Sequence, residues 1–161
     1  MTNSSALTSV ITELVNTERS YVHRLHMLKR EYADPLRTFA RNKDTAILPP
    51  YEAKTLFGNL DNLLPVNEAF LADLERMLQP DGPSTVGGVG EIALRHFRDL
   101  RGFDHYKQYY VKREEAQSIF EREMSKKSSG FAAFVDVRQP THPVSRRPSL
   151  KPHTAHQVLD G

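Results

Sequence analysis

Cysteine is absent from the 161 residues, which excludes disulfide bonds and thiolate metal sites and fits a cytoplasmic protein. Long apolar runs are absent too, since no stretch approaches the ~18 residues of a membrane span. The first ten residues, MTNSSALTSV, lack the basic start and apolar centre of a secretory signal. Alternating β-branched residues, which are typical of strands, occur nowhere. These absences predict an all-α fold without a membrane span.

Motifs of small-molecule chemistry are absent as well. There is no GxxxxGK[ST] loop to cradle a phosphate and no Ser/His/Asp arrangement. His23 and His26 have the i, i+3 spacing of a shared metal site on a helix, as do His153 and His156. Neither pair has a third ligand at a fitting spacing, so solvent-facing histidines explain both. We expect no cofactor and no metal ion.

Most of the chain has no excess of one sign of charge, although the formal net charge is +2. Residues 137–161 hold four of the 22 basic side chains and one of the 20 acidic ones. The first 136 residues are therefore close to neutral. Because nucleic-acid binding requires a concentrated basic face, we expect no nucleic-acid partner.

The segment Val10–Leu36 predicts a long helix packed against other helices. Its apolar stripe recurs in steps of four and three at Leu7, Ile11, Leu14, Tyr21, Leu25, Leu28 and Tyr32. Glu18 occupies the one missing slot, where a carboxylate needs a buried partner. Glu13 lies about 100° off this stripe, on the side of Thr17. We expect Glu18 to face its own protein and Glu13 to face outward.

Further helices are predicted by the apolar spacing and by the positions of Pro and Gly. The expected helices cover residues 4–33, 50–78, 91–100 and 103–126, with a loop over 80–90 and a last apolar element from 131. Asp34 should weaken the first helix because it precedes a proline, and Pro65 should kink or split the second. The helix over 103–126 is expected to have a packed side made of Phe103, Tyr106, Tyr110, Gln117, Phe120 and Met124.

The last 25 residues, Val137–Gly161, differ in composition from the rest. They contain four prolines, three histidines and no aromatic residue. Such a segment buries too little apolar surface to offset its ordering entropy, so we expect a disordered basic tail. The predicted division is a helical domain over residues 1–136 and a tail over 137–161.

Three segments resemble conserved regions of the Dbl-homology domain, the helical exchange domain of guanine-nucleotide exchange factors for Rho-family GTPases. They are ELVNTERSYVHRL followed by Pro35-Leu36, the segment Ile47–Glu75, and the segment Tyr106–Val135. Together they keep the family's order over roughly residues 6–136. The resemblance implies an elongated helical bundle that binds a Rho-family small GTPase and stimulates release of GDP.

The same resemblance implies a GTPase-binding site on the first helix. Glu13 takes the position of the family's glutamate that contacts switch I, and Thr17 and Glu18 belong to the same conserved region. This chemistry makes and breaks no covalent bond, so the chain is expected to be a GTPase regulator and not an enzyme. The alternative interpretation of Glu13, without the resemblance, is a solvated glutamate near the start of a helix, where the helix dipole favours it.

The family pattern stops after Asp136, where a helix with a P-x-Q-R motif and a long final helix are expected. Truncation, alternative splicing or a faulty gene model would each explain a domain that ends before its last conserved region. We expect impaired exchange, with a non-catalytic module that binds a GTPase or another exchange factor as the alternative. Without the later helices, part of the apolar stripe on the first helix has nothing to cover it, which predicts a partner, self-association or marginal stability. Without a pleckstrin-homology domain, recruitment to the membrane periphery would need another route.

Overall fold

The computed structural model describes residues 2–139, with side chains from Ser4 onward. This range is helical apart from turns and loops and contains no strand, so the all-α prediction is confirmed. Its α-helices are α1 (Thr2–Leu28), α2 (Asp34–Phe39), α3 (Pro50–Thr55), α4 (Leu60–Met77), α5 (Gly82–Val86), α6 (Val89–Ala93), α7 (Gly102–Ser125) and α8 (Phe131–Arg138). π-Helical segments at Lys29–Ala33 and Leu94–Asp99 extend α1 and α6.

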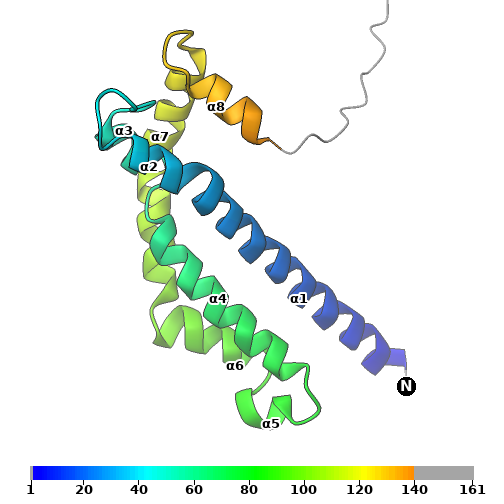
Figure 1. The fold of residues 1–161 in the computed structure, drawn as a ribbon. Helices are drawn as coiled ribbons and strands as arrows, with labels where there is room; N and C mark the ends of the chain where they lie inside the picture. The colour runs from blue at the N-terminus through cyan, green and yellow to red at the C-terminus, as the bar shows by residue number, and fades with distance from the viewer. Residues whose placement is uncertain (1, 140–161) are drawn as a thin grey trace, which may run out of the picture.

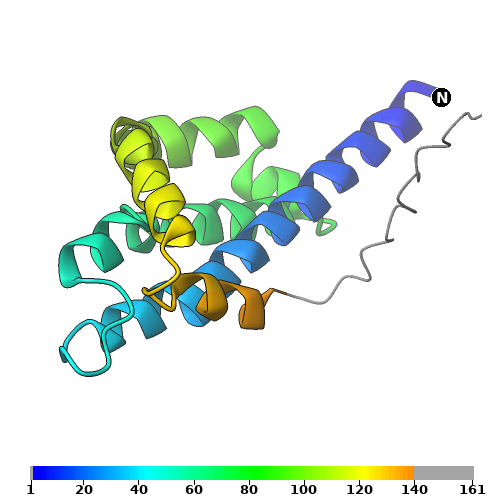
Figure 2. The same ribbon diagram turned by 90° about the horizontal axis from the view of Figure 1, so that it is seen from above.

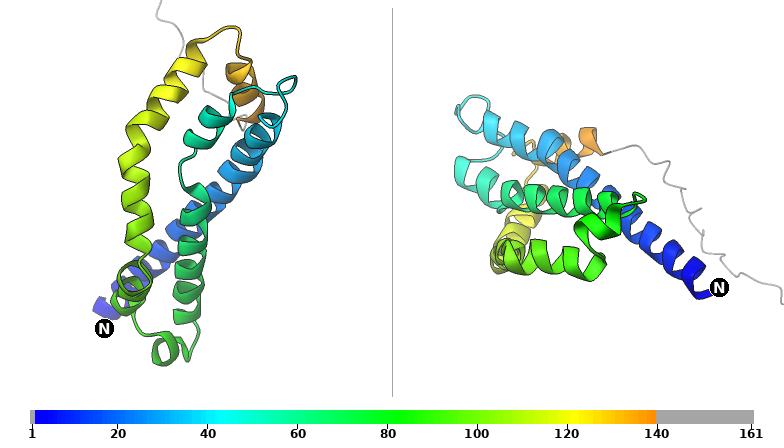
Figure 3. Two further views of the ribbon diagram at one scale, coloured as in Figure 1. Left: turned by 90° about the vertical axis from the view of Figure 1, so that its left-hand side faces the viewer. Right: turned by 90° about the horizontal axis from the view of Figure 1, so that it is seen from below.

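The helices form an elongated bundle in which α4 is the central element. Helix α1 runs along one side of α4 and α7 along the other (Figure 1). Seen from above, the first turns of α1 project beyond the remaining helices (Figure 2). Helix α8 follows α7 and packs at the end of the bundle where α1 continues into α2 (Figure 3).

The first helix was expected to weaken at Asp34, but its α-helical geometry already ends at Leu28 and the chain stays helical beyond Asp34. The chain continues through the π-helical turn into α2 and stays helical to Phe39. Within that turn the backbone N–H of Asp34 donates to the carbonyl of Lys29. The wider π-helical spacing accommodates Pro35, whose ring would otherwise press on the carbonyl of the preceding turn.

Two hydrophobic clusters hold the bundle together. The larger joins the second half of α1 and α2 to α3, the start of α4 and α8, and it includes Leu36, Leu48 and Phe131. The smaller joins the middle of α1 to the second half of α4 and to α6, through Val15, Leu74 and Ile92. Helix α4 contributes its first half to the larger cluster and its second half to the smaller one, so it connects the two clusters.

The buried side of α1 is rotated relative to the predicted stripe. Val15 and Val22, which the stripe omitted, are buried, with Val15 only 1% exposed. Leu7, which opened the stripe, is 60% exposed because the first turns of α1 project beyond α4. Leu25 is buried as predicted. The pattern therefore identified the helix, but the true centre of its buried face is shifted toward Val15 and Val22 by about half a residue's rotation, roughly 50°.

The break in the second predicted helix lies earlier than expected. The chain leaves helical geometry between α3 and α4, where Gly58 has a positive φ of +54°. Pro65 lies inside the continuous helix α4. A Gly in the left-handed region ends the helix without the strain that a side chain would add, so the chain breaks at Gly58 and not at Pro65.

The predicted loop over residues 80–90 contains the short helix α5. Helix α8 continues to Arg138, two residues into the segment that composition assigned to the tail. The tail prediction otherwise concerns residues 140–161, including His153 and His156, and lies outside the described residues.

Candidate functional site

An exposed polar strip follows α1 over its first five turns. Its residues line one shallow depression and are Thr8, Ser9, Thr12, Glu13, Asn16, Thr17 and Ser20. The hydroxyl of Thr12 donates to the carbonyl of Thr8 at 2.8 Å, so its hydrogen is used within its own helix. Glu13 is exposed and makes no hydrogen bond or ion pair with any other side chain in the described range. Its carboxylate is therefore available to an external donor.

Glu18 faces the bundle, as predicted. The side-chain amide of Asn67 on α4 donates to Glu18 Oε1 at 2.7 Å. Asn67 is itself only 3% exposed. Burial raises the pKa of the Glu18 carboxyl, and the hydrogen bond from Asn67 opposes part of that rise. The expectation that this seam carboxylate pairs with a buried donor is confirmed.

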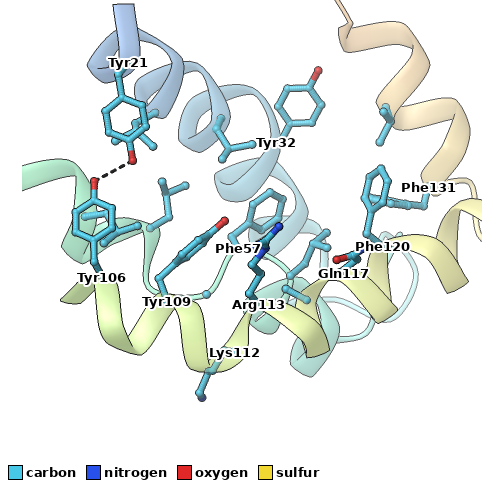
Figure 4. A pocket seen from close by; sticks show the side chains of 18 of the residues that line it. Tyr21, Tyr32, Phe57, Tyr106, Tyr109, Lys112, Arg113, Gln117, Phe120 and Phe131 are labelled. Atoms are coloured by element: carbon cyan, nitrogen blue, oxygen red, sulfur yellow. Dashed lines mark hydrogen bonds between the residues drawn. The ribbon is translucent and has the colours of Figure 1, made fainter. Parts of the chain in front are cut away.

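The Glu18–Asn67 pair belongs to a larger network that connects three helices. The hydroxyl of Tyr106 on α7 donates to the side-chain oxygen of Asn67. The hydroxyls of Tyr106 and Tyr21 lie 2.9 Å apart and share a further hydrogen bond (Figure 4). Burial raises the pKa of Tyr106 far above its usual range, so this phenol stays a hydrogen-bond donor.

This network fixes the rotation of α1 about its own axis. Glu13 and Glu18 are separated by five residues, or about 140° of helical rotation. When Glu18 is held against Asn67, Glu13 must therefore point away from α4. A second link acts on the same helix, since Arg19 Nε donates to Glu75 Oε1 of α4 at 3.0 Å. The buried side of α1 thus orients the exposed one.

The site residues implied by the family resemblance separate into two kinds. Glu13 and Thr17 lie on the exposed strip, and Glu18 lies in the internal network. The hydrogen bonds of Tyr21 and Tyr106 in that network were not predicted from the sequence. The only signal for them was a tyrosine at an apolar position, where burial requires a partner for the hydroxyl.

The two histidines of α1 do not share a ligand. His26 Nε2 lies 2.5 Å from Glu68 Oε1 on α4, and His23 is exposed. Among the described residues, no group of three or more His, Asp or Glu side chains could hold a metal ion. A buried histidine, His96, contacts Asp73 Oδ2 at 2.6 Å and links the segment after α6 to α4.

An apolar groove of about 600 Å³ opens between α1, α4, α7 and α8 (Figure 4). Its walls include Leu28, Tyr32, Phe57, Tyr109 and Phe120. Arg113 points into the groove and has no ion-pair partner within residues 4–139 (Figure 4). This is the uncovered apolar surface along the first helix that the sequence predicted.

Comparison with known proteins agrees with this architecture. A family model for the RhoGEF domain matches residues 10–151. The chain therefore belongs to the RhoGEF (Dbl-homology) domain family, as the conserved segments implied. The match extends past Asp136, where the recognised pattern stopped.

The relatives are much larger proteins. The mouse (Mus musculus) "Rho guanine nucleotide exchange factor TIAM2" is 30% identical over 149 residues, which cover 88% of this chain and 8% of that protein. The human (Homo sapiens) "Phosphatidylinositol 3,4,5-trisphosphate-dependent Rac exchanger 2 protein" is 33% identical over 110 residues, covering 68% of this chain and 7% of that protein. The chain thus spans less than a tenth of either relative.

No solved structure matches the fold closely enough to count as similar. Within residues 2–139, no helix combines the length and the apolar character that crossing a bilayer requires.

Proposed function

We propose that this chain is an exchange domain for a Rho-family small GTPase and accelerates release of GDP. Membership of the RhoGEF family supports this function. The main supporting observation is the position of Glu13, which is exposed and unpaired among the described residues. It lies on a helix whose rotation is fixed by the hydrogen bond between Glu18 and Asn67 on its buried side. Glu13, Thr17 and the supporting Glu18 form the proposed GTPase-binding site.

The proposed mechanism is a population shift without bond-making chemistry. Glu13 accepts hydrogen bonds from a switch segment of the GTPase that has moved off the nucleotide. A charged hydrogen bond contributes about 1.5–3 kcal/mol when it is well made. Because this contact forms only with the displaced switch, it favours the nucleotide-free conformation over the loaded one. The chain thus acts as a GTPase regulator, not as an enzyme in the bond-making sense.

We propose a cytoplasmic protein that is recruited to the membrane periphery through its partners. We also propose self-association through apolar surface that the bundle leaves uncovered, since exposed apolar patches of several hundred Å² are unusual on monomers.

Release of a fluorescent GDP analogue from a panel of Rho-type GTPases tests the exchange function. The chain should accelerate release from at least one member, and Glu13→Ala should reduce the acceleration about ten- to a hundredfold. Glu91→Ala is a matched control, since Glu91 is also an exposed glutamate near the start of a helix. Unchanged release by Glu13→Ala contradicts the role of this carboxylate. Binding without release, across the whole panel, identifies a non-catalytic interaction module instead.

A further inference from the structure

The outer face of α7 is exposed although it carries large apolar side chains. Between residues 103 and 118 this face is formed by six exposed residues on one side of the helix, Phe103, Lys107, Tyr110, Val111, Glu114 and Ser118. Val111 is 82% exposed, Tyr110 64% and Phe103 57%. The prediction that Phe103 and Tyr110 pack inside was therefore wrong, because α7 turns Ala116, Ile119 and Glu123 inward instead. Helix α7 lies along the outside of the bundle (Figure 3), and the exposure of these side chains shows that this face is uncovered.

Two charges in the middle of the outer face of α7 lack strong partners of their own. Glu114 makes no ion pair or hydrogen bond within the described part of the chain. Lys107 Nζ lies 3.9 Å from Asp104 Oδ1, while Arg101 Nε holds the other oxygen of Asp104 at 2.6 Å. Glu114 is thus free to pair with a charge on another molecule, and Lys107 is held only by a long contact that such a pairing can replace.

The sequence of this face is complementary to itself when two copies run antiparallel. A two-fold axis between positions 110 and 111 places Lys107 opposite Glu114 of the second copy, and Glu114 opposite its Lys107. The same axis places Tyr110 opposite Val111, so an apolar centre lies between two ion pairs. A parallel arrangement would instead place like charges opposite one another, which is destabilising.

We infer that a second copy of this chain covers the outer face of α7, packing antiparallel about a two-fold axis between Tyr110 and Val111. An interface of this kind is isologous and closes as a dimer, so it does not propagate into a filament. It deepens the proposed self-association by naming the surface involved. The groove lies on the opposite side of α7, lined by Tyr106, Tyr109 and Ala116, and stays open in this dimer.

The dimer and the GTPase site occupy different sides of the molecule. Helix α4 packs against α1 on one side and against α7 on the other (Figure 1). Exchange activity is therefore expected to survive when the α7 interface is broken. Loss of the dimer and loss of exchange can then be told apart by measuring both in the same variants.

Charge reversal tests the pairing directly. Sedimentation equilibrium of the full chain over a range of concentrations should show a monomer–dimer equilibrium. Lys107→Glu and Glu114→Lys should each weaken the dimer about tenfold or more, since each change replaces two attractions with two repulsions. The double variant Lys107→Glu/Glu114→Lys should restore it. Lys43→Glu, an exposed charge reversal in the loop after α2, serves as the control and should leave the dimer intact.

A cross-linking measurement gives an independent readout, because the chain contains no cysteine. Val111→Cys should cross-link to itself rapidly with a short bismaleimide, and Ser9→Cys on α1 should not. Circular dichroism confirms that each variant is folded. A chain that is monomeric at every concentration overturns the inference. So does a dimer whose strength is unaffected by both single reversals, since its interface must then lie elsewhere.

Discussion

Replacing Asn67 with alanine tests whether the polar network holds the bundle together. Asn67 is almost fully buried, donates to Glu18 Oε1 at 2.7 Å and accepts from the Tyr106 hydroxyl. The alanine variant leaves two half-buried polar groups without this partner, on two different helices. A buried group that loses its partner costs about 1–3 kcal/mol, and because both groups are half-buried and Tyr106 keeps Tyr21, the variant should lose about 1–3 kcal/mol of unfolding free energy in all.

Urea denaturation followed by circular dichroism measures this loss through the shift in midpoint. A control of similar size is Asn62→Ala, because Asn62 is an exposed residue of the same helix and should change the midpoint little. Tyr106→Phe should lose less than Asn67→Ala, since it removes one hydroxyl and leaves the Asn67–Glu18 pair intact. Equal stability of Asn67→Ala and the unmodified chain would refute the role of the network.

Three further changes have expected outcomes in the same denaturation assay. Burial raises the pKa of Glu18 in the folded state, so the folded chain loses stability as the pH rises from the usual glutamate pKa through the raised one. Glu18→Gln cannot ionise, so this variant should be more stable than the unmodified chain near neutral pH and equally stable in acid. Leu74→Ala should cost about 2–5 kcal/mol, because Leu74 is fully buried, whereas Leu7→Ala on the exposed start of α1 should cost little. Gly82→Ala should lower stability by about 1–3 kcal/mol, since its Cβ would lie 2.0 Å from the carbonyl oxygen of Arg76.

Much of the fold could be predicted from local patterns. The apolar spacing along α1 and α4 indicated helices, and Pro and Gly marked most of their ends. What local patterns missed was the response of the backbone to those breakers. The π-helical turn before Pro35 and the left-handed Gly58 moved two breaks away from the residues expected to cause them. Such adjustments depend on packing against other helices, which a single segment does not encode.

The candidate site, like the fold, could be predicted only where local helical geometry decides it. The opposite orientations of Glu13 and Glu18 follow from helical rotation alone. The partner of Glu18 could not be identified, since Asn67 lies 49 residues away and Tyr106 belongs to a third helix. Helix α7 was the least predictable element, because it carries aromatic residues on several sides. Its burial pattern depends on which side meets α4.

Exchange by this chain depends on an outward-pointing Glu13 that stabilises the nucleotide-free GTPase. The affinity of the chain for a responsive Rho-type GTPase, measured once with GDP bound and once without nucleotide, tests it most directly. We expect tighter binding to the nucleotide-free form, and a loss of about ten- to a hundredfold in that affinity alone for Glu13→Ala. An equal loss for both forms, or no loss for either, would contradict it.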